Sequence, residues 1–147
     1  MELTVKKFDE LNTAELYSIL RARAEVFVVE QNCVYQDLDG KDLGAYHVML
    51  CEGGEVVGYL RVIDRGISYD TASIGRVITT ARGRGKGLGY IIINEGIRVA
   101  RECFGADAIT ISAQCQARGF YEKFGFKAVS EQYLEDDIPH VRMVLEL

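Results

Sequence analysis

The sequence has no tryptophan, and its single proline is Pro139. No proline-rich or low-complexity stretch marks a linker, so residues 1–147 are expected to form one domain. No apolar run is long enough to cross a bilayer, and Met1 to Thr4 lack the pattern of a secretory signal. These absences favour a cytoplasmic protein with no membrane partner.

Metal-binding patterns are also missing. The four cysteines have no C-x-x-C spacing, so reduced thiols are expected rather than a zinc site or a disulfide framework. The acidic segment from Glu30 to Asp42 has the composition of a calcium loop, but Gly40 comes two positions too early when the loop is counted from Asp37. The sequence therefore predicts no metal.

Positive charge is the minority in this chain. The formal net charge is -5 and the pI is about 5.1, which argues against a nucleic-acid partner. Against this acidic background, Arg82, Arg84 and Lys86 lie within one glycine-rich stretch. A local basic cluster on an acidic protein indicates a phosphate-bearing ligand.

That stretch connects a predicted strand with a predicted helix. Ile74 to Thr79 is rich in β-branched residues, as strands are, and residues 82–89 carry four glycines. The helix follows with an apolar face at three- and four-residue spacing, formed by Leu88, Ile92, Gly96, Val99 and Cys103. A strand, a glycine-rich turn and a helix N-terminus together form an anion site, because the first N–H groups of a helix have no partner within it.

The turn excludes two common phosphate motifs. Gly85-Lys86 is followed by Gly87, with no Ser or Thr to hold magnesium as in a P-loop, so a nucleotide-binding regulatory protein is disfavoured. A dinucleotide fingerprint would need a glycine at Leu88 or Tyr90. The pattern R-x-x-G-x-G fits instead, with Arg82, Gly85 and Gly87.

This pattern resembles the acetyl-CoA motif of the GNAT superfamily of N-acetyltransferases. A second motif of that family, N-x-x-A-x-x-x-Y-x-x-x-G-F, is met by Ala117, Tyr121, Gly125 and Phe126, with Gln114 in place of asparagine. The segments VFVVEQNCVYQDLDGKD, IGRVI and EDDIPH are similar to the ElaA-type subgroup. The resemblance implies that acetyl-CoA is bound by Val77, Ile78, Thr79, Arg82, Gly83, Arg84, Gly85, Lys86, Gly87, Leu88, Gly89, Gln114, Ala117 and Tyr121.

The rest of the pattern predicts the element order β-α-βββ-α-β-α-ββ, a mixed α/β sheet with helices on its faces. Asn12 and Glu15 form a capping box for the first helix, and Gly53-Gly54 joins two strands of a hairpin. The expected strands are residues 3–8, 47–52, 56–64, 74–79, 108–113, 128–133 and 141–147, and a short helix is expected over 115–124. The resemblance implies a GNAT fold, a twisted mixed sheet of six to seven strands whose fourth and fifth strands splay apart.

The resemblance also implies direct transfer of an acyl group to an amine. Tyr121 takes the role of general acid for the leaving thiolate in the family pattern, and backbone N–H groups near Val77 and Ile78 are candidates to stabilise the thioester oxygen. The general base stays open among carboxylates and one histidine. The candidates are Glu30, Asp37, Glu135 and His140.

Charges in the predicted strand centres bear on the acceptor. Arg61 and Arg76 each stand in the sequence R-V-I, and we expect ion pairs with the acidic segment rather than contact with an acceptor carboxylate. A further hypothesis is that the four carboxylates from Glu30 to Asp42 attract a cationic amine, with Glu30 nearest to it.

The predicted function is therefore an acetyl-CoA-dependent N-acetyltransferase acting on a small-molecule or protein amine. The alternative is a non-catalytic acyl-CoA-binding sensor on the same fold. Whether the chain forms a homodimer is left open.

Overall fold

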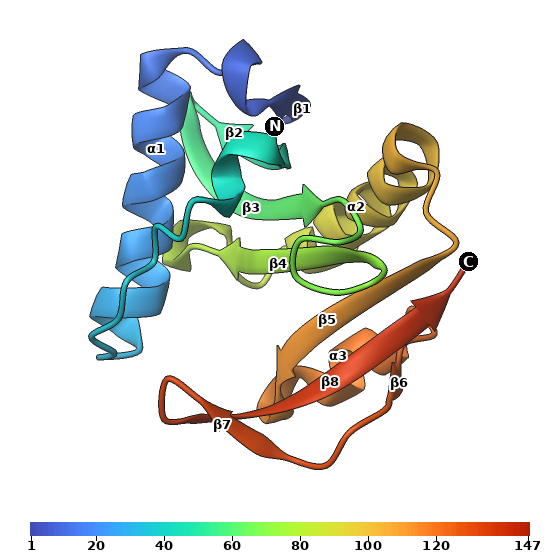
Figure 1. Cartoon of the computed structure of the whole chain (residues 1–147). Coiled ribbons are helices and arrows are strands. Elements are labelled where there is room, and N and C mark those ends of the chain that lie inside the picture. The colour runs from blue at the N-terminus through green and yellow to red at the C-terminus, as the bar shows by residue number, and fades with distance from the viewer.

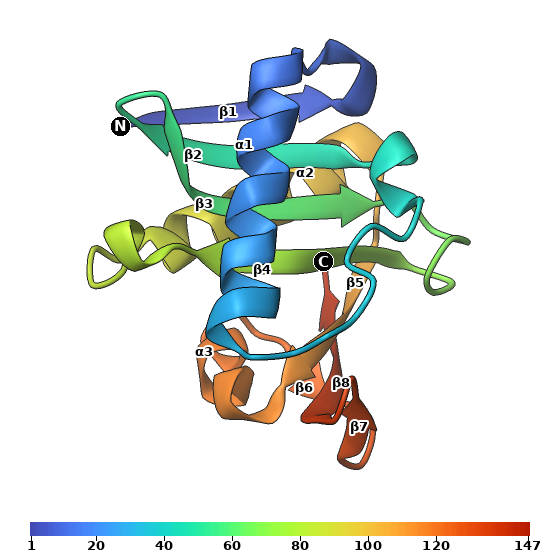
Figure 2. The same cartoon turned by 90° about the vertical axis from the view of Figure 1, so that its left-hand side faces the viewer.

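The computed structural model describes all 147 residues and contains one mixed sheet of eight strands. The strand order is β1-β2-β3-β4-β5-β8-β6, and β7 pairs with β8. Helix α1 covers one face of the sheet and α2 the other (Figures 1 and 2). The bounds are β1 Glu2–Lys7, α1 Thr13–Arg23, β2 Tyr46–Glu52, β3 Glu55–Ile63, β4 Ala72–Thr79, α2 Leu88–Phe104, β5 Ala108–Gln114, α3 Arg118–Glu122, β6 Lys127–Ala128, β7 Tyr133–Glu135 and β8 Ile138–Glu146.

Local signals in the N-terminal half are confirmed. The Glu15 N–H donates to Asn12 Oδ1 at 2.7 Å and the Asn12 N–H to Glu15 Oε1 at 3.0 Å, which is the predicted capping box. Gly53 and Gly54 have φ angles of 60° and 78° and join β2 to β3. After Arg23 the helical backbone continues as a π-helix over Ala24–Glu30, into the start of the acidic segment.

The predicted strand over 128–133 is wrong. The chain forms two short strands there, β6 and β7, with residues 129–132 outside either strand, which brings the sheet to eight strands. Asp136 and Asp137 have φ angles of 50° and 63° and form a two-residue turn between β7 and β8. Asp tolerates this left-handed backbone, so the chain can close a hairpin without the Asn-Gly or Gly-Gly signal that marks most such turns.

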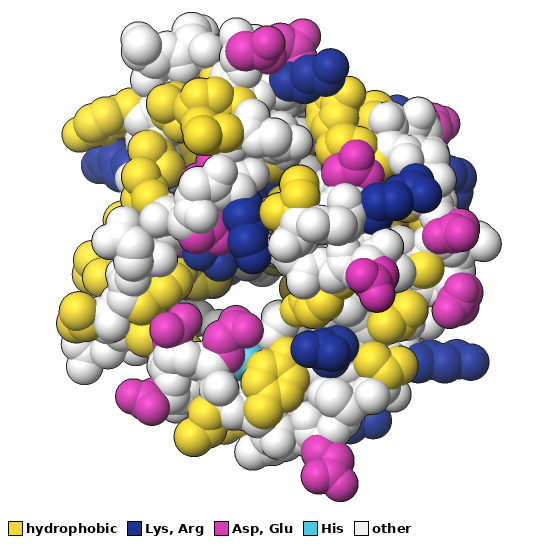
Figure 3. Space-filling view, in the orientation of Figure 1, with side chains coloured by type: hydrophobic (Ala, Val, Ile, Leu, Met, Phe, Trp, Pro, Cys, Tyr) yellow, Lys and Arg dark blue, Asp and Glu magenta, His cyan; other side chains and the backbone are white.

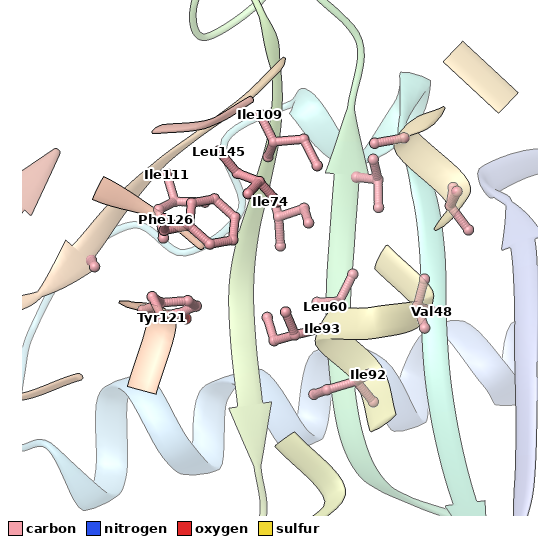
Figure 4. Packing of buried hydrophobic residues seen from close by; sticks show 14 of the residues in the cluster. Val48, Leu60, Ile74, Ile92, Ile93, Ile109, Ile111, Tyr121, Phe126 and Leu145 are labelled. Atoms are coloured by element: carbon pink, nitrogen blue, oxygen red, sulfur yellow. The ribbon is translucent and has the colours of Figure 1, made fainter. Parts of the chain in front are cut away.

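Two apolar cores lie on opposite faces of the sheet. The larger contains 20 buried residues between α2, α3 and the sheet, and Figure 4 shows Ile92 and Ile93 of α2 lying against Leu60 and Val48. Gly96 lets α2 approach closely, because a Cβ there would lie 3.1 Å from side-chain atoms of Leu60 and Ile74. The smaller core, on the α1 face, has seven buried residues.

The sheet opens between β4 and β5. These two strands pair in parallel only at Ala72 with Ile109 and at Ser73 with Thr110, and further along they diverge (Figure 1). The pairing of β3 with β4 shifts register between Tyr59 and Arg61, and Arg76 in the bulge has a φ of 52°. The predicted splay of the fourth and fifth strands is therefore confirmed.

Candidate functional site

A cavity of about 730 Å³ lies where β4 and β5 separate. Figure 3 shows its opening as a hollow near the centre of that face, with Lys and Arg side chains directly above it and Asp, Glu and His side chains at its lower left edge. The cavity is lined by predicted site residues from the strands, from α3 and from the segments that precede α2 and α3. Those residues are Val77, Ile78, Thr79, Arg84, Gln114, Ala117, Tyr121 and His140.

Tyr121 reaches this cavity from α3. Its ring packs edge-on against Phe120 and Phe126, with centroids 5.2 Å and 5.9 Å away, and Figure 4 shows Tyr121 close to Phe126 beside β4. Its hydroxyl forms no hydrogen bond with protein groups, and burial raises the pKa of Tyr121 to about 12. The phenol therefore stays protonated at neutral pH and is free to donate a proton or hydrogen bond inside the cavity.

The basic turn, residues Arg82 to Gly89, supplies an anion site at the start of α2. Gly85 and Gly87 have φ angles of 77° and 71°, and a Cβ at either would meet no protein atom within 4 Å. The backbone N–H groups of Gly85, Lys86 and Gly87 donate to no protein acceptor. Open space beside free N–H groups at a helix N-terminus is the arrangement that accepts a phosphate.

The cations of the basic turn already have carboxylate partners. Arg82 donates to Glu55 at 2.6 Å, Lys86 to Glu52 at 3.3 Å, and Arg84 pairs with Glu30. All three basic side chains are about 45% exposed. Exposed pairs of this kind contribute only about 0–1 kcal/mol, so a phosphate can replace the carboxylates at low cost.

Several predicted coenzyme residues do not line the cavity itself. Gly83 packs against β3, since a Cβ there would lie 2.6 Å from the Val57 carbonyl oxygen, and the Leu88 side chain lies in the larger core. Their predicted contribution is through the backbone. The predicted residues outside the lining are Glu30, Arg82, Gly83, Gly85, Lys86, Gly87, Leu88 and Gly89.

Two of the four predicted base candidates meet at the cavity wall. His140 Nδ1 lies 2.6 Å from the Ile138 carbonyl oxygen, so Nδ1 carries the proton and donates it there. His140 Nε2 then faces the Glu135 carboxylate at 3.4 Å. Glu135 also accepts from Ser112 Oγ at 3.1 Å, and Ser112 in turn contacts the Tyr133 hydroxyl. This chain of polar groups can pass a proton away from the cavity.

The other two base candidates point elsewhere. Glu30 pairs with Arg84 and does not itself line the cavity. Asp37 is buried and is held by Arg23 Nε at 2.9 Å and Arg76 Nε at 2.8 Å, so neither carboxylate is placed to take a proton from an amine in the cavity. The sequence cannot show which of these four residues can act as the base, because that depends on which partner each side chain contacts in the folded protein.

A buried arginine cluster is formed by Arg23 of α1, Arg61 of β3 and Arg76 of β4. Arg61 donates to Asp39 at 2.8 Å and 2.6 Å and to Asp42 at 2.9 Å. Arg76 pairs with Asp37 and with Asp39, so the predicted ion pairs are confirmed. The partner carboxylates of the whole cluster are Asp37, Asp39 and Asp42.

These pairs alter the acidity of the partner carboxyls. Burial alone would raise the pKa of Asp39 and Asp42, but hydrogen bonds and positive charge outweigh it and hold both pKa values below the ordinary range. The carboxylates from Glu30 to Asp42 are thus all matched by arginines. The hypothesis that this segment forms a negative lining that attracts a cation is therefore wrong, because its charge is neutralised within the protein.

The sequence analysis missed Lys41 and Ser112 as cavity residues. Both side chains line the cavity, yet Lys41 appeared only within the ElaA-type segment and Ser112 only near the end of a predicted strand. The alternating pattern of residues 108–113 could have placed Ser112 on one face of its strand, but not beside Glu135. In the structure, no group of three or more His, Cys, Asp and Glu side chains could hold a metal ion, and no helix is long and apolar enough to span a membrane.

Comparison with known proteins places the chain in a family. A family model described as an acetyltransferase (GNAT) domain matches residues 11–147. Protein ElaA of Escherichia coli is 36% identical over 140 residues, covering 94% of this chain and 92% of ElaA. Its crystal structure has a TM-score of 0.92 at 35% identity and covers 99% of this chain and 100% of ElaA.

Two further solved structures share the arrangement. An acyl-CoA N-acyltransferase from Pseudomonas aeruginosa has a TM-score of 0.91 at 39% identity, with 97% of each chain covered. An aminoglycoside 6'-N-acetyltransferase in complex with coenzyme A has a TM-score of 0.72 at 15% identity, covers 97% of this chain and 96% of that one, and shows the shared fold. This chain belongs to the GNAT acetyltransferase family and to its ElaA-like branch.

Proposed function

We propose that this protein transfers an acetyl group from acetyl-CoA to a primary amine. The observation that carries the proposal is the cavity between the diverging strands, which brings Tyr121 and the pair of Glu135 and His140 to one space. A protonated phenol and a carboxylate–imidazole pair in one cavity supply both proton transfers of an aminolysis.

The basic turn suits the diphosphate of the coenzyme. Three free N–H groups, two glycines with nothing beside them and three weakly held cations are present together at the N-terminus of α2. The acyl-bearing arm would then run along β4, past Val77, Ile78 and Thr79, into the cavity. Gln114 and Ala117 border the same space from β5 and the start of α3.

The reaction needs three things from the protein. As the amine nitrogen bonds to the thioester carbon, the carbonyl oxygen becomes negative and needs N–H donors, which the bulged backbone near Val77 and Ile78 is positioned to offer. As the carbon–sulfur bond breaks, the leaving thiolate takes a proton from Tyr121. The attacking nitrogen loses one proton to a base.

Glu135 and His140 are our choice for that base. His140 donates through Nδ1 to Ile138, which leaves Nε2 as the nitrogen that faces Glu135 and can accept a proton. Ser112 and Tyr133 continue the chain of polar groups beyond Glu135. A proton leaving the amine can therefore be accepted at either Glu135 or His140 and shared with the other.

Release of free thiol from acetyl-CoA in the presence of an amine panel tests the proposal. Tyr121→Phe should keep coenzyme affinity and lower kcat on the order of a hundredfold, because one proton donor is lost and little volume changes. Tyr90→Phe is the matched control, since Tyr90 is exposed on α2 and bonds only to Lys123. Turnover of Tyr121→Phe within twofold of the wild type would mean that Tyr121 only packs.

Variants of the proposed base residues provide a second test. Glu135→Gln and His140→Gln should each lower kcat/KM and flatten the dependence of kcat/KM on pH. The control is Glu131→Gln, which should change neither, because Glu131 is exposed, lies outside the cavity lining and forms no salt bridge. Tight binding of acetyl-CoA with no thiol release for any amine would favour the alternative, a non-catalytic acyl-CoA sensor.

A further inference from the structure

The two walls of the cavity carry opposite charge. The end of β7 and the turn that follows it supply the carboxylates of Glu135 and Asp136. The facing wall, from β3, β4 and residues 35–41, supplies Lys41, Arg61 and Arg76 among its lining residues. Figure 3 shows Lys and Arg side chains directly above the hollow and Asp or Glu side chains at its lower left edge. A ligand that fits both walls carries both charges.

The basic wall has one positive charge more than its own carboxylates neutralise. The three arginines of the buried cluster meet three carboxylates, so that set is neutral. Lys41 Nζ bonds to Ser68 Oγ at 3.0 Å and forms no salt bridge. Lys41 is thus an ammonium group at the cavity with no anionic partner.

A second observation on this wall is independent of Lys41. Arg61 is only 4% exposed and lines the cavity, and its Nε atom is buried without a hydrogen-bond partner. Buried N–H groups are rarely left unpaired, because losing the hydrogen bond to water without a replacement is costly. An unpaired donor and an ammonium group without an anionic partner, both in the lining of one cavity, mark a place for an anionic acceptor atom.

We propose that the acceptor is a zwitterion, a primary amine that carries a carboxylate on the same molecule. The carboxylate binds at Lys41 and Arg61, and the ammonium group is held at Glu135 and Asp136 until it loses its proton. This inference rests on the proposed function and names its substrate class. Anchoring the carboxylate at one wall also turns the amine toward the acyl group and away from the arginines, because like charges repel.

The chemistry excludes two other classes of amine. A polyamine would bring a second positive charge against Lys41 and the arginines. A neutral carboxamide could accept a hydrogen bond but would leave the lysine charge unmatched. The preferred acceptors are therefore amino acids in the broad sense, with the amine at the α, β or a more distant carbon.

The test measures α-, β- and ω-amino acids beside their carboxamides and their decarboxylated amines. Thiol release gives kcat/KM, and ligand-observed NMR on the protein with coenzyme A gives binding without turnover. For at least one amino acid, the free carboxylate should be preferred over its carboxamide by about tenfold or more in both measurements.

Lys41 variants test whether the basic wall of the cavity causes the preference for a carboxylate-bearing acceptor. Lys41→Gln should remove the preference for the carboxylate, and Lys41→Glu should reverse it toward the decarboxylated amine. Lys127→Gln makes the same charge change at an exposed lysine of β6 that forms no salt bridge, and it should leave the preference intact. Coenzyme affinity should stay the same in all three variants, which also shows that each of them folds.

The outcomes separate this inference from the proposed function. If only amines without a carboxylate are acetylated, or if carboxylate and carboxamide are treated alike, the chain is an N-acetyltransferase and the zwitterion inference is overturned. If no amine reacts, the proposed function fails, and NMR still decides whether carboxylate-bearing amines bind through Lys41. If no carboxylate-bearing amine binds or reacts, the inference is overturned.

Discussion

The buried arginine cluster and the basic turn both pair with carboxylates, but the first does so away from solvent and the second at the surface. Side chains of the buried arginine cluster are 0% exposed at Arg23 and 5% at Arg61, whereas Arg82 and Arg84 of the basic turn are 45% and 46% exposed. Removing one partner from a buried pair leaves a charge without water or counter-ion, but an exposed pair can exchange its carboxylate for solvent. The first group therefore fixes one wall of the cavity, and the second is free to change partners.

This contrast assigns different roles to the same residue type. The buried cluster ties residues 37–42 to α1, β3 and β4 through Asp37, Asp39 and Asp42. It holds an irregular segment and the start of the 3-10 helix Lys41–Gly44 against the sheet beside the cavity. The cations of the basic turn, in contrast, meet carboxylates only at the surface, and the N–H groups of Gly85, Lys86 and Gly87 have no protein acceptor.

The largest effect is expected at the centre of the buried cluster. Arg23→Met should lower the free energy of unfolding by about 3–5 kcal/mol, because Asp37 and Asp42 would remain buried without it. Urea denaturation measures the change. Arg82→Gln is the exposed counterpart and should cost less than about 1 kcal/mol. Equal losses in the two variants would contradict the contrast between buried and exposed pairs.

Acid should lower the stability that the buried cluster contributes. Asp39 and Asp42 have pKa values lowered in the folded state, so their contribution to stability is complete above the unfolded pKa of about 3.9 and is lost as pH falls through the folded pKa. The melting temperature should therefore decrease as the pH is lowered below about 4. Glu52→Gln, at an exposed pair, should leave this profile unchanged. A melting temperature that stays constant down to pH 3 would contradict the prediction.

Substitutions at two glycines with similar backbone angles can distinguish backbone strain from loss of ligand binding. Gly87 and Gly66 have φ angles of 71° and 85°, and a Cβ added at either position would meet no other atom within 4 Å. Gly87→Val and Gly66→Val should each cost about 1–3 kcal/mol of stability through backbone strain. Only Gly87→Val should weaken coenzyme A binding, by about tenfold or more, or at least about 1.4 kcal/mol. Equal coenzyme affinity in both variants would mean that the basic turn does not contact the ligand.

The smallest effect is expected where one surface pair competes with the ligand. Glu30→Gln releases Arg84 and should strengthen coenzyme A binding severalfold, which corresponds to less than about 1 kcal/mol. Stability should change by no more than about 0.5 kcal/mol. Glu25→Gln, an exposed change in the same π-helix at a residue without a salt bridge, is the matched control for titration calorimetry. Weaker binding after Glu30→Gln would instead give Glu30 a direct role at the ligand.

Some of the site was determined by local sequence. The strand, glycine turn and helix from Ile74 to Phe104 follow from β-branched residues, four closely spaced glycines and an apolar face at helical spacing. The capping box at Asn12 and the hairpin at Gly53-Gly54 depend on neighbours in the chain, and both are present as predicted. The family resemblance extended this to the splayed strands and to Tyr121 at the cavity.

Only the tertiary structure decided which charges meet. Glu30 and Glu135 are both exposed acidic residues near an element end, yet one faces Arg84 and the other faces His140 across the β7–β8 hairpin. The turn at Asp136 and Asp137 carries none of the usual glycine signals, so the hairpin that creates this arrangement was not predicted. The partner of a charged side chain is set by contacts between residues far apart in sequence, and periodicity and spacing hold no information about such contacts. The sequence by itself therefore determined the family, most of the elements and the glycine-rich basic turn, and the packing of distant segments decided which side chains form the walls of the cavity.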